Sequence, residues 1–130
     1  MTNNKPKLYI LNSPIIPIKN DKECEVYVLK TKNLAKARMF VSNSIYGAEY
    51  ELVSAIGHES TAKILSYLLE MEIKPNRIAI TVDEKDRILA FTLDFRLPEG
   101  KVLTEDELEK ILNEGKYSFT IMYVESCTEA

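Results

Sequence analysis

The stretch Gly57-His-Glu-Ser-Thr-Ala-Lys-Ile-Leu-Ser-Tyr-Leu-Leu69 decides the fold. Its apolar residues recur on one face at helical spacing, which predicts an amphipathic helix with the buried stripe Ile64, Leu65, Leu68 and Leu69. Such a helix needs a second layer to cover its apolar face. Short runs of strand-forming residues flank it on both sides. We therefore predict a single α/β or α+β domain, in which one layer of helices flanks a mixed central sheet of about five strands.

Alternating or continuous apolar runs mark the expected strands, which are Leu8–Leu11, Glu25–Lys30, Arg77–Val82, Arg87–Phe95 and Tyr117–Val124. The polar turn Asp83–Asp86 joins two of these runs. Arg77–Val82 and Arg87–Phe95 are therefore expected to pair as an antiparallel hairpin. Pro14 and Pro17, which follow the first strand, have no backbone N–H to donate to a neighbouring strand. An irregular loop is therefore predicted over Ser13–Ile18.

Two further helices are predicted from composition and capping residues. Leu34–Val41 has helical composition. Thr104 and Glu107 have the spacing of a capping box, which predicts a helix over Glu105–Glu114. Gly115 then stands at the position where a left-handed residue commonly ends a helix.

The chain has 130 residues, about one domain's worth, and no linker or repeat divides it. Its polar ends, residues 1–7 and 125–130, are expected to fray. No apolar run approaches the ~18–20 residues of a membrane span, so we expect a cytoplasmic protein without a membrane partner. Cys24 and Cys127 match neither a metal motif nor a disulfide framework. Two free thiols are the favoured expectation, and one disulfide tying the C-terminal tail is the alternative.

The charge balance limits the class of partner. The chain has 17 Lys plus Arg against 20 Asp plus Glu, a formal charge of −3, which argues against binding to long nucleic acid. It has one histidine, so multi-histidine metal centres are excluded and a neutral-pH imidazole can act at one place only. No phosphate-binding loop, dinucleotide fingerprint or zinc-protease motif is present, and no metal or cofactor is expected.

The histidine itself, His58, follows Gly57 where the amphipathic helix begins. The free amides of a helix N-terminus favour an anion. Ser60 and Thr61 add hydroxyl groups there, and glycine allows close backbone approach. A phosphate at this position would lie beside an imidazole that can donate a proton to a leaving oxygen. The alternative is a structural histidine that is capped or half-buried at a helix end.

Two other constellations are candidate binding groups. Arg96 has a guanidinium that can bind oxyanions bidentately, and Glu99 could hold that arginine or accept a hydrogen bond from a ribose hydroxyl. A surface ion pair is the alternative explanation of this pair. Asn12 and Ser13 end the first predicted strand, where α/β sheets often place ligands. A simple turn before Pro14 explains them equally well.

The order and spacing of three segments resemble the viral ring nuclease family, the type III anti-CRISPR proteins known from archaeal viruses. The segments are Ser54-Ala-Ile-Gly-His-Glu-Ser-Thr-Ala62, Pro75-Asn-Arg-Ile78 and Arg96-Leu-Pro-Glu-Gly-Lys-Val-Leu-Thr104. The resemblance runs from Leu8 to about Val124 and is weakest over residues 21–50.

This resemblance implies a homodimer that binds cyclic tetra-adenylate across its cleft and cuts it without a metal, which would antagonise type III CRISPR signalling. In its terms His58 is the general acid, and Arg96 and Glu99 are the loop arginine and glutamate. Asn12 corresponds to the asparagine ending the first strand, and Ser13 to a nearby hydroxyl residue. Two alternatives remain open from the residues: a module that binds the ring without cutting it, and a DNA-binding protein of a mobile element.

Overall fold

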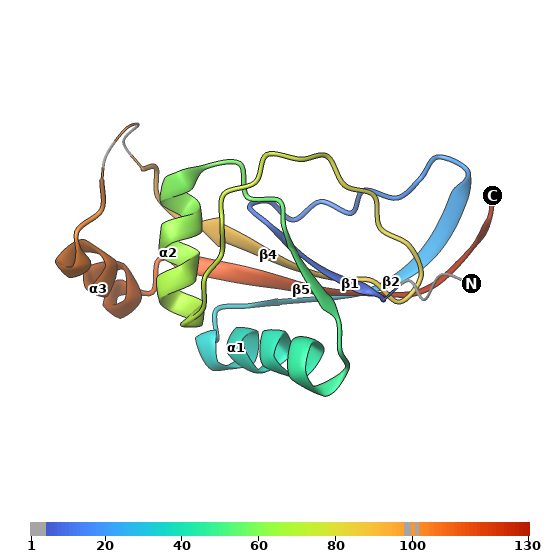
Figure 1. The fold of residues 1–130 in the computed structure, drawn as a ribbon, viewed down its shortest axis with the longest axis horizontal. Coiled ribbons are helices and arrows are strands. Elements are labelled where there is room, and N and C mark those ends of the chain that lie inside the picture. The colour runs from blue at the N-terminus through green and yellow to red at the C-terminus, as the bar shows by residue number, and fades with distance from the viewer. Residues whose placement is uncertain (1–4, 98–99, 101) are drawn as a thin grey trace.

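The described residues form a five-stranded mixed sheet with three α-helices packed on one face (Figure 1). The computed structural model describes residues 5–97, 100 and 102–130. Its strands are β1 (Lys7–Leu11), β2 (Lys22–Thr31), β3 (Glu51–Ser54), β4 (Arg87–Leu93) and β5 (Tyr117–Glu129). Its helices are α1 (Leu34–Ser42), the short π-helix η1 (Asn43–Gly47), α2 (Glu59–Leu69) and α3 (Glu105–Glu114). The predicted α+β class is confirmed.

The strand order is β2-β5-β4-β1-β3. β1 pairs in parallel with both β3 and β4, whereas β5 pairs antiparallel with β4 and with β2. Because β1, β3 and β4 run in the same direction, their carboxyl ends meet at one edge of the sheet. The chain leaves this edge in the segments that contain Asn12, His58 and Arg96.

Both faces of the sheet bury apolar side chains. On one face the predicted stripe of α2 (Ile64, Leu65, Leu68 and Leu69) is buried in a cluster that also includes residues of α1, α3 and the sheet. On the other face Tyr9, Met122 and Val82 belong to a second cluster, together with residues of the two long loops 12–21 and 70–86. These loops are the blue and yellow segments that lie across the sheet from α1 in Figure 1.

The local signals predicted at both ends of α3 are confirmed, and the start of α1 has a similar cap. Thr104 and Glu107 form both halves of the capping box at the start of α3, and Gly115 ends α3 in the left-handed conformation at φ 63°. At α1, the Asn33 side chain accepts a hydrogen bond from the Lys36 amide at 3.1 Å. These ends follow from residues a few positions apart, which is why the sequence alone locates them.

The predicted hairpin is wrong. Residues 77–82 form no strand, and their one ladder contact is an isolated parallel bridge between Val82 and Ile18. Both edges of β4 are already occupied, by β1 and β5, so no edge remains for a hairpin partner. The fifth strand is instead β3, whose four residues are too short for alternation to reveal.

The frayed ends and the free thiols are also corrected. Residues 125–129 continue β5, and Cys127 on β5 lies opposite Cys24 on β2. The two cysteines form a disulfide across a Cα–Cα distance of 4.1 Å. At the other end of the chain Lys7 pairs with Glu51 at the start of β1. Pairing with strands distant in sequence therefore orders Lys7 and residues 125–129, whereas residues 1–4 lie outside the described part of the chain.

Candidate functional site

A pocket of about 1260 Å³ lies at the edge of the sheet where the parallel strands end. It is built by three parts of the chain: the first turns of α2, the segment after β4 and the segment before α3. Arg77 joins them from the loop that follows α2. The lining residues are His58, Glu59, Ser60, Thr61, Lys63, Arg77, Leu93, Arg96, Leu97, Gly100, Val102 and Leu103.

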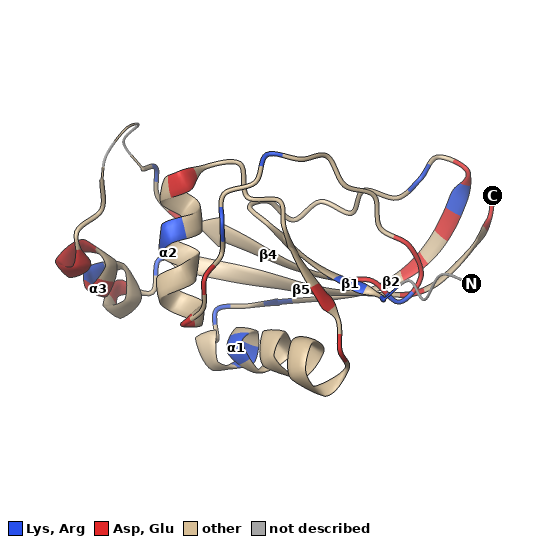
Figure 2. Cartoon of the chain, viewed as in Figure 1, with Lys and Arg blue, Asp and Glu red and all other residues tan. Residues whose placement is uncertain are grey.

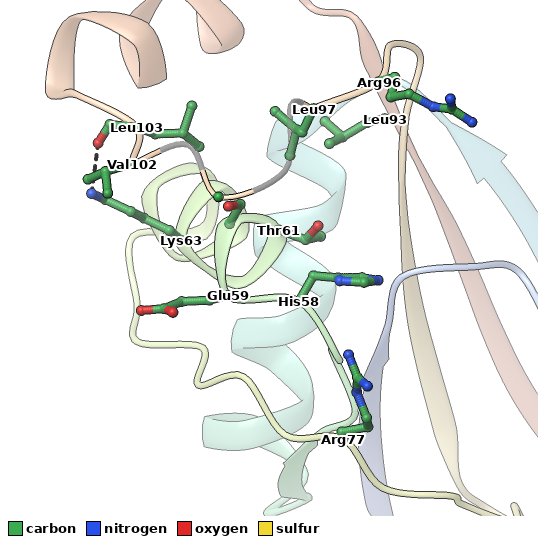
Figure 3. A pocket seen from close by; sticks show the side chains of 12 residues that line it. His58, Glu59, Thr61, Lys63, Arg77, Leu93, Arg96, Leu97, Val102 and Leu103 are labelled. Atoms are coloured by element: carbon green, nitrogen blue, oxygen red, sulfur yellow. Dashed lines mark hydrogen bonds between the residues drawn. The ribbon is translucent and has the colours of Figure 1, made fainter.

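His58 is the N-cap residue of α2. Its backbone is extended, with φ −118° and ψ 127°, and its side chain makes no capping hydrogen bond. The imidazole is therefore available for another purpose. Figure 3 shows the ring pointing into the pocket, with Arg77 below it and Arg96 above. Because α2 begins at Glu59, the positive end of its dipole also faces this space.

The charged side chains of the pocket favour an anion. Lys63, Arg77 and Arg96 are cationic, and the carboxylate of Glu59 points away from His58 in Figure 3. The Lys63 ammonium is held by a hydrogen bond of 2.7 Å to the Leu103 carbonyl oxygen. In Figure 2 the acidic bands of β2 lie at the opposite end of the molecule. The pocket lining thus has three cationic residues and one acidic residue in a chain of net charge −3.

Four predicted site residues meet in this pocket: His58, Ser60, Thr61 and Arg96. Others do not line it. Gly57 stands directly before His58, and its carbonyl oxygen lies 3.4 Å from the Arg77 guanidinium. Asn12 and Ser13 follow β1, the strand between β3 and β4, which His58 and Arg96 follow. Glu99 lies outside the described residues.

Two lining cations, Lys63 and Arg77, were not among the predicted site residues. Arg77 stands in the segment Pro75-Asn-Arg-Ile78, which carries part of the family resemblance. Nothing in the sequence indicated that this arginine lines the pocket. Arg77 contacts Gly57, where an added Cβ would lie at the ordinary contact distance of 3.5 Å from Arg77 Nε. Lys63 follows Glu59 by one helical turn, which predicts a shared face but not that this face borders a pocket.

No group of three or more His, Cys, Asp or Glu side chains that could hold a metal ion occurs in residues 5–97, 100 and 102–130. No helix in those ranges is long and apolar enough to cross a bilayer.

The fold and the site define a small α+β protein with a cationic, histidine-containing pocket at the carboxyl edge of its parallel strands. The chain belongs to the STIV B116-like family, whose model matches residues 8–119. It is 43% identical over 107 residues to protein 26 of Sulfolobus islandicus filamentous virus, covering 80% of this chain and 83% of that protein.

Other relatives come from archaeal viruses as well. A protein of Acidianus two-tailed virus, ORF117, is 34% identical over 105 residues, covering 80% of this chain and 85% of the relative. Among solved structures, B116 of Sulfolobus turreted icosahedral virus superposes with a TM-score of 0.68 at 25% identity, covering 90% of this chain and 98% of that one. Protein 26 and ORF117 both carry the description "uncharacterized".

Proposed function

We propose that this protein is a metal-independent ring nuclease, which binds cyclic tetra-adenylate as a homodimer and cleaves it. The observation that carries the proposal is the position of His58. It is the N-cap residue of α2, its side chain makes no capping hydrogen bond, and its ring points into a pocket that Arg77 and Arg96 also line. A cyclic oligonucleotide of four phosphates is an anion small enough for such a pocket. The motif spacing around these same residues supports this substrate class.

RNA carries its own nucleophile, the ribose 2′-hydroxyl, so the protein does not have to supply one. The ribose 2′-oxygen attacks the adjacent phosphorus and forms a 2′,3′-cyclic phosphate, while the bond from phosphorus to the 5′-oxygen breaks. His58 donates its proton to the departing 5′-oxygen, and the 2′-hydroxyl proton passes to solvent. General acid catalysis of this kind contributes ~10²–10⁴-fold. Cutting two opposite linkages yields two linear di-adenylates.

The arginines serve charge and alignment. The Arg96 guanidinium would bind the non-bridging oxygens, where negative charge increases in the transition state, with a planar fork that suits a phosphate. Arg77, Lys63 and the first turn of α2 would hold the neighbouring phosphates. Glu99 is proposed to orient the 2′-hydroxyl, on the strength of the motif alone.

The homodimer is proposed from exposed apolar side chains of the pocket lining and of the two long loops 12–21 and 70–86. Ile15 is 54% exposed, Ile78 is 45% exposed and Val102, which lines the pocket, is 80% exposed. The loops that hold the first two run together, joined by the hydrogen bond from the Val82 amide to the Pro17 carbonyl at 3.0 Å. A second copy packed on this surface would cover these residues. It would also supply a second His58 for the opposite linkage.

The test is incubation of the protein with radiolabelled cyclic tetra-adenylate in EDTA, followed by separation of the products and by binding measurements. We expect linear di-adenylates from the wild type. His58→Ala should bind the ring with affinity near that of the wild type and lower the single-turnover rate by about 100-fold or more. Because the His58 side chain makes no capping hydrogen bond, this variant should unfold at the wild-type temperature.

A control for loss of stability is Asn33→Ala, which removes the N-cap of α1 and changes no residue that lines the pocket. It should lower the free energy of unfolding by about 1 kcal/mol and leave cleavage unchanged. Full activity in His58→Ala would remove the histidine from the mechanism. Tight binding of an intact ring by the wild type would favour a sequestering module. Absence of binding would overturn both, and retention of duplex DNA would favour the DNA-binding alternative.

A further inference from the structure

We propose that Asn76 is a positioning residue for His58, assisted by Ser54, and that together they set the geometry of the proposed cleavage. The inference rests on the proposed function of His58. It concerns the junction Ser54–His58, which joins the end of β3 to the start of α2. This junction is short: Ser54 ends β3, residues 55–58 belong to no helix or strand, and α2 begins at Glu59.

The position of β3 at the edge of the sheet creates the need for such residues. The inner side of the junction is held by β1, because the Ala55 amide donates to the Ile10 carbonyl at 2.9 Å. No further strand lies on its outer side. Unpaired carbonyl groups at that edge would leave the path into α2 free to shift.

Asn76 supplies the missing outer contacts. Its side-chain amide donates to the Ser54 carbonyl at 2.8 Å, and its backbone amide donates to the Ile56 carbonyl at 2.7 Å. Ile56 is fully buried, so this second bond ties the junction to the core. One residue thereby binds two alternate carbonyl groups, as a neighbouring strand would do.

Ser54 also fixes this junction, through bonds of its side-chain hydroxyl. Its hydroxyl donates to the Lys74 carbonyl at 2.6 Å and accepts from the Ile56 amide at 3.4 Å. The two segments are thus joined in both directions, because Ser54 donates to Lys74 and Asn76 donates to Ser54. His58 comes next after this braced stretch and Gly57, so the direction of its side chain depends on these bonds.

The expected consequence is a loss of turnover with little loss of binding. A displacement of about 1 Å in a catalytic group can cost ~10²-fold in rate. Lys63 and Arg77, which are proposed to hold the phosphates, should keep their positions when the side chain of Asn76 or Ser54 is changed. Lys63 remains bonded to Leu103, and the Asn76 backbone amide, next to Arg77, remains in place whatever the side chain is.

The experiment compares Asn76→Ala and Asn76→Asp with the wild type. Aspartate has the shape of asparagine but lacks the donor, so both variants lose the bond to the Ser54 carbonyl. We expect the single-turnover cleavage rate to fall about tenfold or more, with the dissociation constant for cyclic tetra-adenylate changed less than about twofold. Ser54→Ala should behave similarly, whereas Ser54→Thr, which keeps the hydroxyl, should restore the rate. Asn33→Ala serves as the control for loss of an asparagine bond elsewhere.

Amide hydrogen exchange over residues 54–58 of the unliganded protein gives an independent reading. It should rise at least about tenfold in Asn76→Ala and stay at the wild-type level in Asn33→Ala. Wild-type cleavage and wild-type exchange in Asn76→Ala would overturn the positioning role. If the wild-type protein binds the ring without cutting it, the proposed reaction is overturned, and the exchange comparison still decides whether Asn76 holds the junction.

Discussion

His58 and Arg96 follow two strands that do not touch, β3 and β4, yet their side chains line one pocket. The strand between them is β1, which is parallel to both. Three parallel strands end at the same edge of the sheet, so the segments that follow them converge. This relationship explains why residues from two motifs far apart in the sequence line one pocket.

Arg96→Lys should slow cleavage by about tenfold or more while the ring still binds. Lysine keeps the positive charge but replaces a planar, bidentate fork with a point charge, which fits the transition-state oxygens less well. Single-turnover rates and equilibrium binding, measured on the same preparation, separate the two effects. Arg38→Lys is the matched control, because Arg38 bonds the Leu68 carbonyl outside the pocket. An unchanged rate in Arg96→Lys would rule out a role for the guanidinium fork.

Reduction of the disulfide between Cys24 and Cys127 should lower the free energy of unfolding by about 4–5 kcal/mol. The bond closes a sequence separation of 103 residues, so it greatly restricts the unfolded chain. Chemical denaturation with and without a reductant measures the difference. The double variant Cys24→Ser, Cys127→Ser should resemble the reduced wild type and show no response to the reductant. Equal stability of oxidised and reduced wild type would show that this bond does not form in solution.

Thr104→Ala should lower the free energy of unfolding by about 1 kcal/mol. The Thr104 hydroxyl accepts the Glu107 amide at the start of α3, and alanine leaves that amide without its capping acceptor. Thr104→Ser keeps the hydroxyl and should stay within a few tenths of the wild type. Thermal unfolding of the three proteins tests this. A serine variant as unstable as the alanine variant would assign the loss to packing instead of capping.

The free energy of unfolding should fall as the pH rises above about 10. Burial raises the pKa of Tyr9, and the carboxylates of Asp86 and Glu51 raise it further. The unfolded chain then loses this proton at lower pH than the folded one, so the contribution is complete below the unfolded pKa and is lost as the pH rises through the folded one. Tyr9→Phe should therefore lose stability less steeply between about pH 9.5 and 11. Parallel curves for the two proteins in urea titrations would contradict this.

Local signals predicted local structure well. The capping box of α3, the left-handed Gly115 and the buried stripe of α2 all depend on residues within a turn or two of one another. The loop over Ser13–Ile18 follows from its prolines. The same logic placed His58 at a helix N-terminus, where the structure has it.

Signals that depend on strand pairing were less informative. Arg77–Val82 alternates like a strand, but β1 and β5 occupy both edges of β4 and leave it no partner there. Glu125–Glu129 is polar like a frayed tail, but pairing with β2 makes it a strand. The disulfide follows from that pairing, because it brings Cys24 opposite Cys127.

The sequence by itself determined where the helices start, which face of α2 is buried and that the one histidine stands at the start of α2, since these depend on neighbours along the chain. Only the tertiary structure decided which strands adjoin, and therefore which distant residues share the pocket. Arg77 shows the difference most clearly. Its motif is legible in the sequence, but its place beside His58 arises because the loop after α2 packs along the open edge of β3.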